Sequence, residues 1–340
     1  MTRREFAQLA ALSAGALPAP GASSYAAAEA GMKIGLYSIT YLGVWYRGDA
    51  LTIEEVIQRA RRFGYDGVEI DGKRPHANPL DMPPPRCRAL REFAAGQGIE
   101  IYAVAANNDF SSPIPEHRES QLLYARELIR VTADLGANRM RVFLAWPGVT
   151  LLPEGGGRYD IAQAAWRQVH ERFSDEQTWQ WCRQSLSETA RYAGDHGVVL
   201  ALQNHPPVIR GYQDCLRMVR EVNSPHLRVC FDARLEHQLG PEGIERVVQE
   251  VGSWQVLSHF GGEYTEGPGG IQCTEALQCL AEVRGLTAIG YQGYIGFELC
   301  HPLPVVDGKT AGIDFVDQNA RLAAEYMRGI ISRCGQERRG

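Results

Sequence analysis

Four strand-like runs in the second half of the chain each end near a side chain that can bind a metal ion. The runs are VVLALQNHP, LRVCFDARLE, WQVLSHFGGE and YIGFELCHP, and the potential ligands are Gln203, Asp232, His259 and Glu298. These oxygen and nitrogen donors suit a divalent cation such as Mn²⁺, Co²⁺, Mg²⁺ or Zn²⁺. A metal bound in this way would acidify a C–H bond beside a carbonyl, so the residues predict proton-transfer chemistry on a sugar-like substrate.

The order of strand and helix signals indicates how these runs are placed. From Met32 onward the sequence alternates eight times between an apolar, β-branched run and an amphipathic stretch. This pattern predicts parallel strands with right-handed crossovers, and we expect an α/β fold, a single (β/α)₈ TIM barrel over residues 32–333 with a C-terminal tail at 334–340. A doubly wound sheet is the alternative, but no glycine-rich dinucleotide turn follows the first strand.

Local signals agree with this alternation. Thr52 with Glu55 three positions later predicts a capping box at the start of a helix, and Gly64 predicts the end of that helix. A longer Gly- and Pro-containing insertion occupies residues 147–174. Because the ends of barrel strands meet at one mouth, the four potential ligands should converge there. A purely structural polar network is the alternative, but each buried polar group would then need its own partner.

Composition limits the classes of partner. The chain has 340 residues, is 44% hydrophobic and 22% charged, and carries a formal net charge of −5. A nucleic-acid enzyme usually presents a basic face, so we expect no nucleic-acid partner. Beyond the N-terminus no long uncharged apolar run predicts a membrane span. We expect a small-molecule sugar or glycoside as the partner, and homo-oligomers remain open.

The N-terminus has the features of an export signal. Arg3 and Arg4 precede a weakly apolar Ala/Leu-rich run and a small-residue site that ends at Ala30. This pattern is similar to a cleavable twin-arginine signal peptide, so we expect residues 1–30 to be removed and the protein to be periplasmic or secreted. A chance arginine pair in an N-terminal extension would leave it in the cytoplasm. The eight cysteines contain no C-x-x-C motif, and we expect Cys230 and Cys300 to be buried.

The stretches ALQNHPP, QVLSHFGGE and GYIGFELCHPLP carry a resemblance to a known family. The chain from Met32 onward resembles the xylose isomerase-like TIM-barrel superfamily, in particular exported sugar phosphate isomerase/epimerase members similar to enzymes that isomerise, hydrate or cleave 3-keto sugars and 3-keto glycosides. In that family Glu, Asp, His and Glu from successive later strands hold the metal. The resemblance therefore implies the same role for Gln203, Asp232, His259 and Glu298.

Gln203 departs from the family pattern. The epimerases of this superfamily use two glutamates on opposite faces of the substrate, whereas a glutamine cannot act as a base, although its amide oxygen can bind a metal. We therefore expect one principal base and an enolisation that leads to isomerisation or β-elimination. The candidate bases are Glu298 and His205, which shares a strand face with Gln203. His205 is alternatively a hydrogen-bonding residue behind the ligands.

Further residues at strand ends are candidates for substrate binding. Arg234 shares a face with Asp232 and would orient substrate hydroxyls, or form a structural ion pair. The other candidates are Glu69, Asn107, Trp146, Glu263 and His301. A non-catalytic periplasmic carbohydrate-binding barrel is the alternative function, and Gln203 is the best argument for it. An abasic-site endonuclease is a remote alternative, because it would need a larger metal cluster and a basic face.

Overall fold

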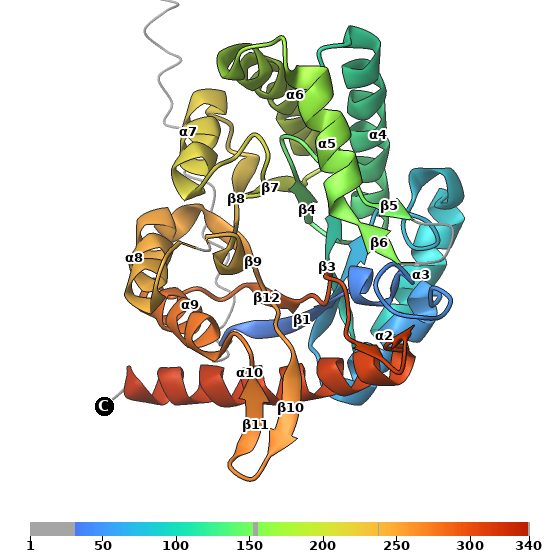
Figure 1. Cartoon of the computed structure of the whole chain (residues 1–340). Coiled ribbons are helices and arrows are strands. Elements are labelled where there is room, and N and C mark those ends of the chain that lie inside the picture. Colours follow the sequence, from blue (N-terminus) through green and yellow to red (C-terminus); the bar gives the residue numbers. More distant parts are fainter. Residues whose placement is uncertain (1–30, 152–155, 237, 339–340) are drawn as a thin grey trace, which may run out of the picture. The chain divides into compact units, whose positions relative to one another are not determined.

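The computed structural model describes residues 31–151, 156–236 and 238–338 of the chain. In this part eight parallel strands close into a barrel in the order β1-β12-β9-β8-β7-β4-β3-β2 (Figure 1). The predicted TIM barrel is therefore confirmed, whereas the predicted signal peptide at 1–30 lies outside the described residues. The barrel strands are β1 (Lys33–Tyr37), β2 (Gly67–Asp71), β3 (Glu100–Ala105), β4 (Arg139–Val142), β7 (Val199–Gln203), β8 (Leu227–Asp232), β9 (Gln255–Phe260) and β12 (Tyr294–Phe297).

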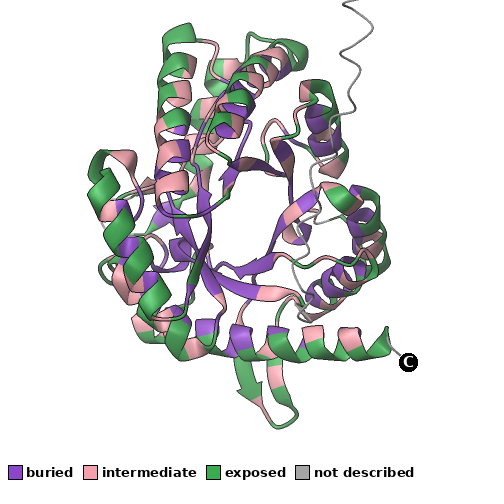
Figure 2. Ribbon diagram, turned by 180° about the vertical axis from the view of Figure 1, so that it is seen from behind, coloured by how far each residue is buried: buried purple, intermediate pink, exposed green. Residues whose placement is uncertain are grey.

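Helices surround the barrel on its outside (Figure 1). Figure 2 shows the strands as almost wholly buried, with exposed residues on the outer faces of the helices, which is the pattern expected where amphipathic helices cover a parallel sheet. No helix in the described ranges is long and apolar enough to span a bilayer. The surrounding helices are α2 (Ile53–Phe63), α3 (Pro84–Gly96), α4 (Pro115–Asp134), α6 (Asp175–Asp195), α7 (Tyr212–Val222), α8 (Pro241–Val251), α9 (Ala276–Ala288) and α10 (Ile313–Glu337).

Helix ends follow the local signals of the sequence. Thr52 and Glu55 form the predicted capping box at the start of α2, and Gly64 ends that helix in the left-handed conformation with φ 80°. The last helix differs from expectation, because α10 continues to Glu337 and includes residues 334–337, which we expected in a tail. The apolar face of this helix continues to Cys334, which is buried and keeps the final turn packed on the barrel.

Three additions to the barrel fall where the sequence predicts only loops. The insertion between β4 and α6 contains the short hairpin β5 (Thr150–Leu151) and β6 (Gly157–Arg158), followed by α5 (Tyr159–His170), which has no buried residue. A second hairpin, β10 (Tyr264–Gly267) with β11 (Gly270–Cys273), follows β9 and projects away from the barrel (Figure 1). The third hairpin follows β12 and consists of β13 (Val305–Val306) and β14 (Lys309–Thr310).

An aromatic pair fills the interior of the barrel below the mouth. The rings of Tyr102 on β3 and Tyr294 on β12 stack with centroids 3.9 Å apart. Strands β1 and β12 leave space for Tyr102 by placing glycine against it. A Cβ atom at Gly296 would lie 2.7 Å from the Tyr102 hydroxyl oxygen, and one at Gly35 would overlap the ring itself. The absence of these two side chains therefore allows the barrel to close around a tyrosine.

This packing predicts that Gly35→Ala destabilises the protein by about 1–3 kcal/mol, because the added methyl group overpacks the barrel interior. The measurement is the free energy of unfolding in urea. Gly329→Ala is the matched control, since a Cβ atom there meets nothing within 4 Å and alanine is the better helix former. A Gly35→Ala protein as stable as the Gly329→Ala protein would show that the barrel interior does not require this glycine.

Candidate functional site

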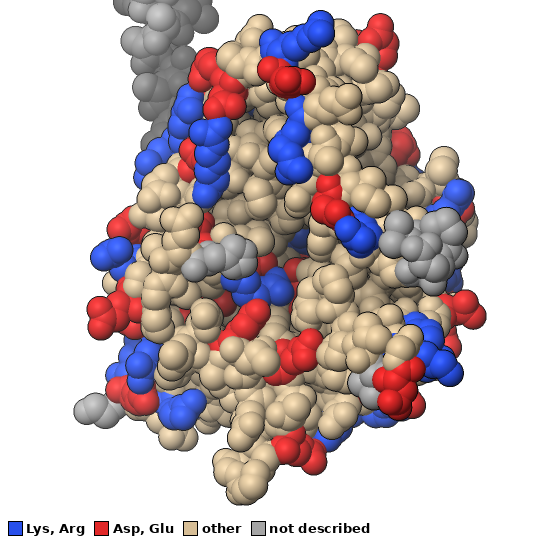
Figure 3. Space-filling model, in the orientation of Figure 1, with Lys and Arg blue, Asp and Glu red and all other residues tan. Residues whose placement is uncertain are grey.

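A cavity of about 720 Å³ opens at the carboxyl ends of the barrel strands, the end at which TIM barrels carry their sites. Figure 3 shows charged side chains of both signs around a hollow in the face of the barrel. Nine of the predicted site residues line this cavity: Asn107, Trp146, Gln203, His205, Asp232, Arg234, Glu263, Glu298 and His301.

The other two predicted residues, Glu69 and His259, do not line the cavity. Both are fully buried, and Nε2 of His259 lies 2.7 Å from Oε2 of Glu69. We expected His259 to bind the metal and Glu69 to bind the sugar. Instead, the two side chains pair with each other across the barrel. The physical reason is that a carboxylate without solvent access requires charged or hydrogen-bonding partners, and these two residues supply them.

Two carboxylates at the mouth converge on one guanidinium group. Nη2 of Arg234 lies 2.8 Å from Oδ2 of Asp232 and 2.6 Å from Oε1 of Glu298. Nε of Arg234 also donates to Oδ1 of Asp232, at 3.1 Å. The Asn204 side chain holds the backbone of Asp232 in place, because it accepts from the Asp232 N–H and donates to the Asp232 carbonyl oxygen. Asn204 therefore points away from the cavity, as strand alternation predicts, and fixes the end of the neighbouring strand.

A second guanidinium group, that of Arg141 on β4, lies deeper in the site. It is 3% exposed, donating from Nε to Oε1 of Glu69 at 2.8 Å and from Nη1 to Oε1 of Gln203 at 2.5 Å. Gln203 in turn donates to Oδ2 of Asp232 at 3.1 Å. Our sequence reasoning missed Arg141. A charged residue within the apolar run NRMRVFLAW, on a strand buried on both faces, is the signal that could have revealed it.

These contacts form one continuous chain, which we call the polar chain. Its members, in order, are His259, Glu69, Arg141, Gln203, Asp232, Arg234 and Glu298. Cys300 extends it at the cavity wall, since its thiol lies 3.0 Å from Oε1 of Glu298. Cys230 is buried as expected, but Cys300 differs from our expectation because it is half-buried and lines the cavity.

The cations of the polar chain keep its buried glutamates ionised. Burial by itself would raise the pKa of Glu298, but Arg234, together with His259 and Arg141, holds the pKa well below its usual range. Burial by itself would also raise the pKa of Glu69, but His259 and Arg141 lower that pKa below its usual value. Both groups are therefore carboxylates near neutral pH, and neither is a strong base.

His205 differs from these glutamates because its side chain is uncharged. Burial lowers the pKa of His205 to about 4, so the ring is uncharged near neutral pH. Its Nδ1 lies 2.5 Å from the carbonyl oxygen of Pro206. A carbonyl can only accept a hydrogen bond, so the proton belongs on Nδ1 and the lone pair on Nε2. The rings of Phe143 and Trp146 contact the imidazole with centroids 5.0 Å away and hold its orientation.

Part of the cavity wall is aromatic. Trp45 and Tyr159 pack with ring centroids 4.9 Å apart, and Tyr159 meets Trp146 edge-on at 6.0 Å. The Lys73 ammonium lies 5.1 Å from the centroid of a Trp146 ring. Sequence reasoning did not identify Trp45, Lys73 or Tyr159 as lining residues. Tyr159 comes from the start of α5, whose packing over the mouth depends on the conformation of a long insertion.

The rim of the cavity holds the remaining candidates. Asn107 donates to Oδ1 of Asp71 at 3.0 Å, while the Tyr37 hydroxyl donates to the other oxygen of the same carboxylate. His301 and Glu263 lie opposite each other, with Nε2 and Oε1 separated by 3.1 Å. These polar groups surround the opening with both donors and acceptors, which is the arrangement that a polyhydroxylated ligand requires.

Each of the four predicted metal ligands has at least one donor atom engaged by another side chain. Nε2 of His259 and Oε1 of Gln203 each meet a charged partner, and both carboxylates hold Arg234. Among the described residues, no group of three or more His, Cys, Asp or Glu side chains is arranged to hold a metal ion. In this arrangement the four side chains bind neighbouring groups in place of an ion, and we assign no chemical step to a metal.

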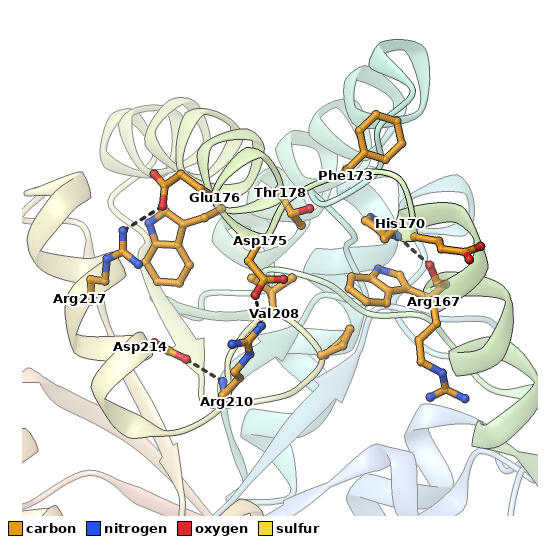
Figure 4. Close-up of a pocket in the computed structure, with 14 residues that line it drawn as sticks. Arg167, His170, Phe173, Asp175, Glu176, Thr178, Val208, Arg210, Asp214 and Arg217 are labelled. Carbon is orange, nitrogen blue, oxygen red and sulfur yellow. Dashed lines mark hydrogen bonds and ion pairs between the residues drawn. The ribbon is translucent and has the colours of Figure 1, made fainter.

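A second hollow, of about 280 Å³, lies on the outside between α5, α6 and α7 (Figure 4). Its charged groups pair with one another: Arg210 bonds Asp175, and Arg217 lies 3.5 Å from Glu176. Arg217 also lies over the ring of Trp179, 4.3 Å from the centroid. With its polar groups turned toward each other along an exposed groove, this hollow lacks the converging groups found at the barrel mouth.

The comparison with protein families gives a clear assignment. Residues 57–318 match the family described as xylose isomerase-like TIM barrel. The chain belongs to this family. A comparison with curated proteins finds no match.

Solved structures with the same fold include several sugar epimerases. The D-psicose 3-epimerase of Clostridium cellulolyticum H10 is similar with a TM-score of 0.67 and 18% identity, covering 88% of this chain and 99% of its own. The 3-keto-D-glucoside 4-epimerase of E. coli has a TM-score of 0.62 at 18% identity, with coverages of 88% and 99%. The IolI protein with a bound zinc atom has a TM-score of 0.61 at 16% identity, with coverages of 90% and 99%. At these identities the likeness establishes the fold.

The polar chain predicts a large effect of removing Arg141. The Arg141→Met protein should lose about 3–5 kcal/mol of unfolding free energy, because Glu69 would remain charged and buried with one cation fewer. The measurement is urea unfolding at neutral pH.

Lys33→Met is the matched control, since Lys33 pairs with Glu100 at the surface with side chains 43% and 51% exposed. Loss of such a pair should cost less than about 1 kcal/mol. Equal losses in the two variants would mean that the Arg141–Glu69 pair contributes no more than a surface ion pair.

Proposed function

We propose that the protein is an enzyme of the sugar isomerase/epimerase class that removes a proton from the carbon beside a keto group of an unphosphorylated sugar or 3-keto glycoside, which leads to isomerisation or β-elimination. The observation that supports this most directly is that His205 and the cationic Arg234 line the same cavity. Proton abstraction beside a carbonyl needs a base for the carbon acid and a positive charge for the oxygen that becomes negative. The family and the sugar epimerases that share the fold support the same class of reaction.

The proposed first step is the breaking of one C–H bond. Nε2 of His205 takes the proton, and the electron pair moves into the carbonyl group to form an enediolate. The guanidinium group of Arg234 stabilises the negative oxygen, as a preorganised donor does in an oxyanion hole. Phe143 and Trp146 pack around the imidazole and thereby limit its access to water.

The second step decides the product. Return of the proton from His205 to the neighbouring carbon, with transfer of the hydroxyl proton to the enediolate oxygen, gives an isomer. Departure of a leaving group from the β carbon with its bonding electron pair gives an elimination product, and the proton on His205 can pass to the leaving group. A single base on one side of the cavity supports these one-base outcomes, and the two-glutamate epimerase mechanism loses a carboxylate where Gln203 stands. Glu298, which we expected as an alternative base, is assigned to orienting Arg234 because it is an ion-paired carboxylate.

The aromatic wall supports a substrate with an apolar face. Trp45, Trp146 and Tyr159 line one side of the cavity, and aromatic rings of this kind pack against the C–H face of a pyranose or against an apolar aglycone. The members of the polar chain that line the same cavity would meet the hydroxyl and keto groups. A 3-keto glycoside carries both kinds of surface.

The test is deuterium incorporation into a 3-keto glucoside in D₂O, followed by NMR together with release of the aglycone. The wild-type protein should incorporate deuterium, and His205→Gln should lower the rate about 10²–10⁴-fold, the usual contribution of a general base. His226→Gln is the control, because His226 precedes β8 at the opposite end of the barrel.

Incorporation at the wild-type rate in His205→Gln would remove His205 from the reaction. Binding of the sugar without exchange or aglycone release would favour the non-catalytic carbohydrate-binding barrel instead.

A further inference from the structure

The two carboxylates at the barrel mouth already share a cation. Oδ2 of Asp232 and Oε1 of Glu298 lie 2.8 Å and 2.6 Å from one atom, Nη2 of Arg234. These residues come from β8 and from the end of β12, at two of the four strand ends where the sequence predicts a metal site. The side chain of Arg234 thus places a single positive charge where the carboxylates would otherwise require an external one.

The charge balance of the site also differs from that of a metal centre. The polar chain contains three carboxylates, those of Glu69, Asp232 and Glu298, and two guanidinium groups, those of Arg141 and Arg234. The two guanidinium groups already offset two of the three negative charges, so a divalent cation added to this set would leave an excess of positive charge unless one guanidinium group departed. Gln203 contributes no further negative charge to attract such an ion.

The backbone makes room for Arg234 in this position. A Cβ atom at Gly261, directly after β9, would overlap Nη1 of Arg234 and lie 3.1 Å from its Cδ and Cζ atoms. The guanidinium group therefore lies against a glycine surface as well as between two carboxylates. Its side chain is 15% exposed, which leaves it accessible to a ligand in the cavity without full solvation.

We infer that Arg234 replaces the metal ion of this site, so that the protein binds and polarises its substrate with a guanidinium group and without a divalent cation. The role of Arg234 in the reaction rests on the proposed function, whereas the exclusion of the metal does not. An arginine presents fixed N–H donors in a plane. It therefore selects substrates in which the keto oxygen and a neighbouring hydroxyl lie side by side, as they do in an α-hydroxy ketone.

The test is titration of chelated full-length protein with Mn²⁺, followed by electron paramagnetic resonance of the free ion and by calorimetry. Arg234→Met keeps the length of the side chain but removes its charge, and should bind Mn²⁺ at least about ten-fold more tightly than the wild type, because two carboxylates then lack a cation. Arg234→Lys keeps the charge and should stay close to the wild type.

Thermal unfolding checks that each variant is folded, and Arg234→Gln takes the place of Arg234→Met if the latter is not. The inference is overturned if the wild type binds Mn²⁺ as tightly as the uncharged variant and Asp232→Asn abolishes that binding in both. It is also overturned if deuterium exchange by the wild type requires added Mn²⁺. A lack of exchange with every keto sugar would contradict the proposed function and leave the Mn²⁺ comparison valid.

Discussion

The ion pair between Arg141 and Glu69 is the interaction on which the rest of the site depends. It joins β4 to β2 inside the barrel, where both side chains are almost completely removed from solvent. A carboxylate at that depth is stable only with charged or hydrogen-bonding partners, and Arg141 and His259 supply them from different strands. Because the pair links the two strands on either side of β3, these strands are fixed relative to one another, and the floor of the cavity is fixed with them.

The chemistry of the mouth follows from how Arg141 uses its second nitrogen. Arg141 donates to Oε1 of Gln203, and the amide nitrogen of Gln203 therefore faces Asp232. The carboxylate of Asp232 also accepts from Arg234, and Arg234 in turn donates to Glu298, which thereby joins the same network. A glutamate in place of Gln203 could not donate to Asp232, and the two carboxylates would repel each other. The single amide therefore allows a chain of alternating donors and acceptors, with its outer guanidinium group in the cavity.

Much of the fold could be predicted from the sequence because it depends on local patterns. The alternation of apolar runs with amphipathic stretches determines a parallel barrel, and the Thr52–Glu55 capping box and Gly64 mark the ends of a helix by their own hydrogen bonding. The insertion was different, since α5 buries no residue of its own and its position depends on contacts such as Tyr159 against Trp45. Such contacts join residues distant in sequence, and no local pattern reports them.

The residues at the strand ends were also predictable, because strand alternation and barrel closure determine which side chains reach the mouth. What each donor atom contacts was not predictable. His259 pairs with Glu69, and Glu69 also accepts from Arg141, whose depth in the barrel is a tertiary property. The same holds for Arg234, which the sequence places beside Asp232 but whose second contact, with Glu298, comes from a strand more than sixty residues away.

The most direct measurement is a crystal structure of the protein grown with MnCl₂, with anomalous diffraction used to locate manganese. The account predicts no anomalous peak between Asp232 and Glu298, and electron density for the guanidinium group of Arg234 bridging the two carboxylates. A manganese peak bound by Asp232, His259 and Glu298, with Arg234 turned away and His259 separated from Glu69, would contradict it.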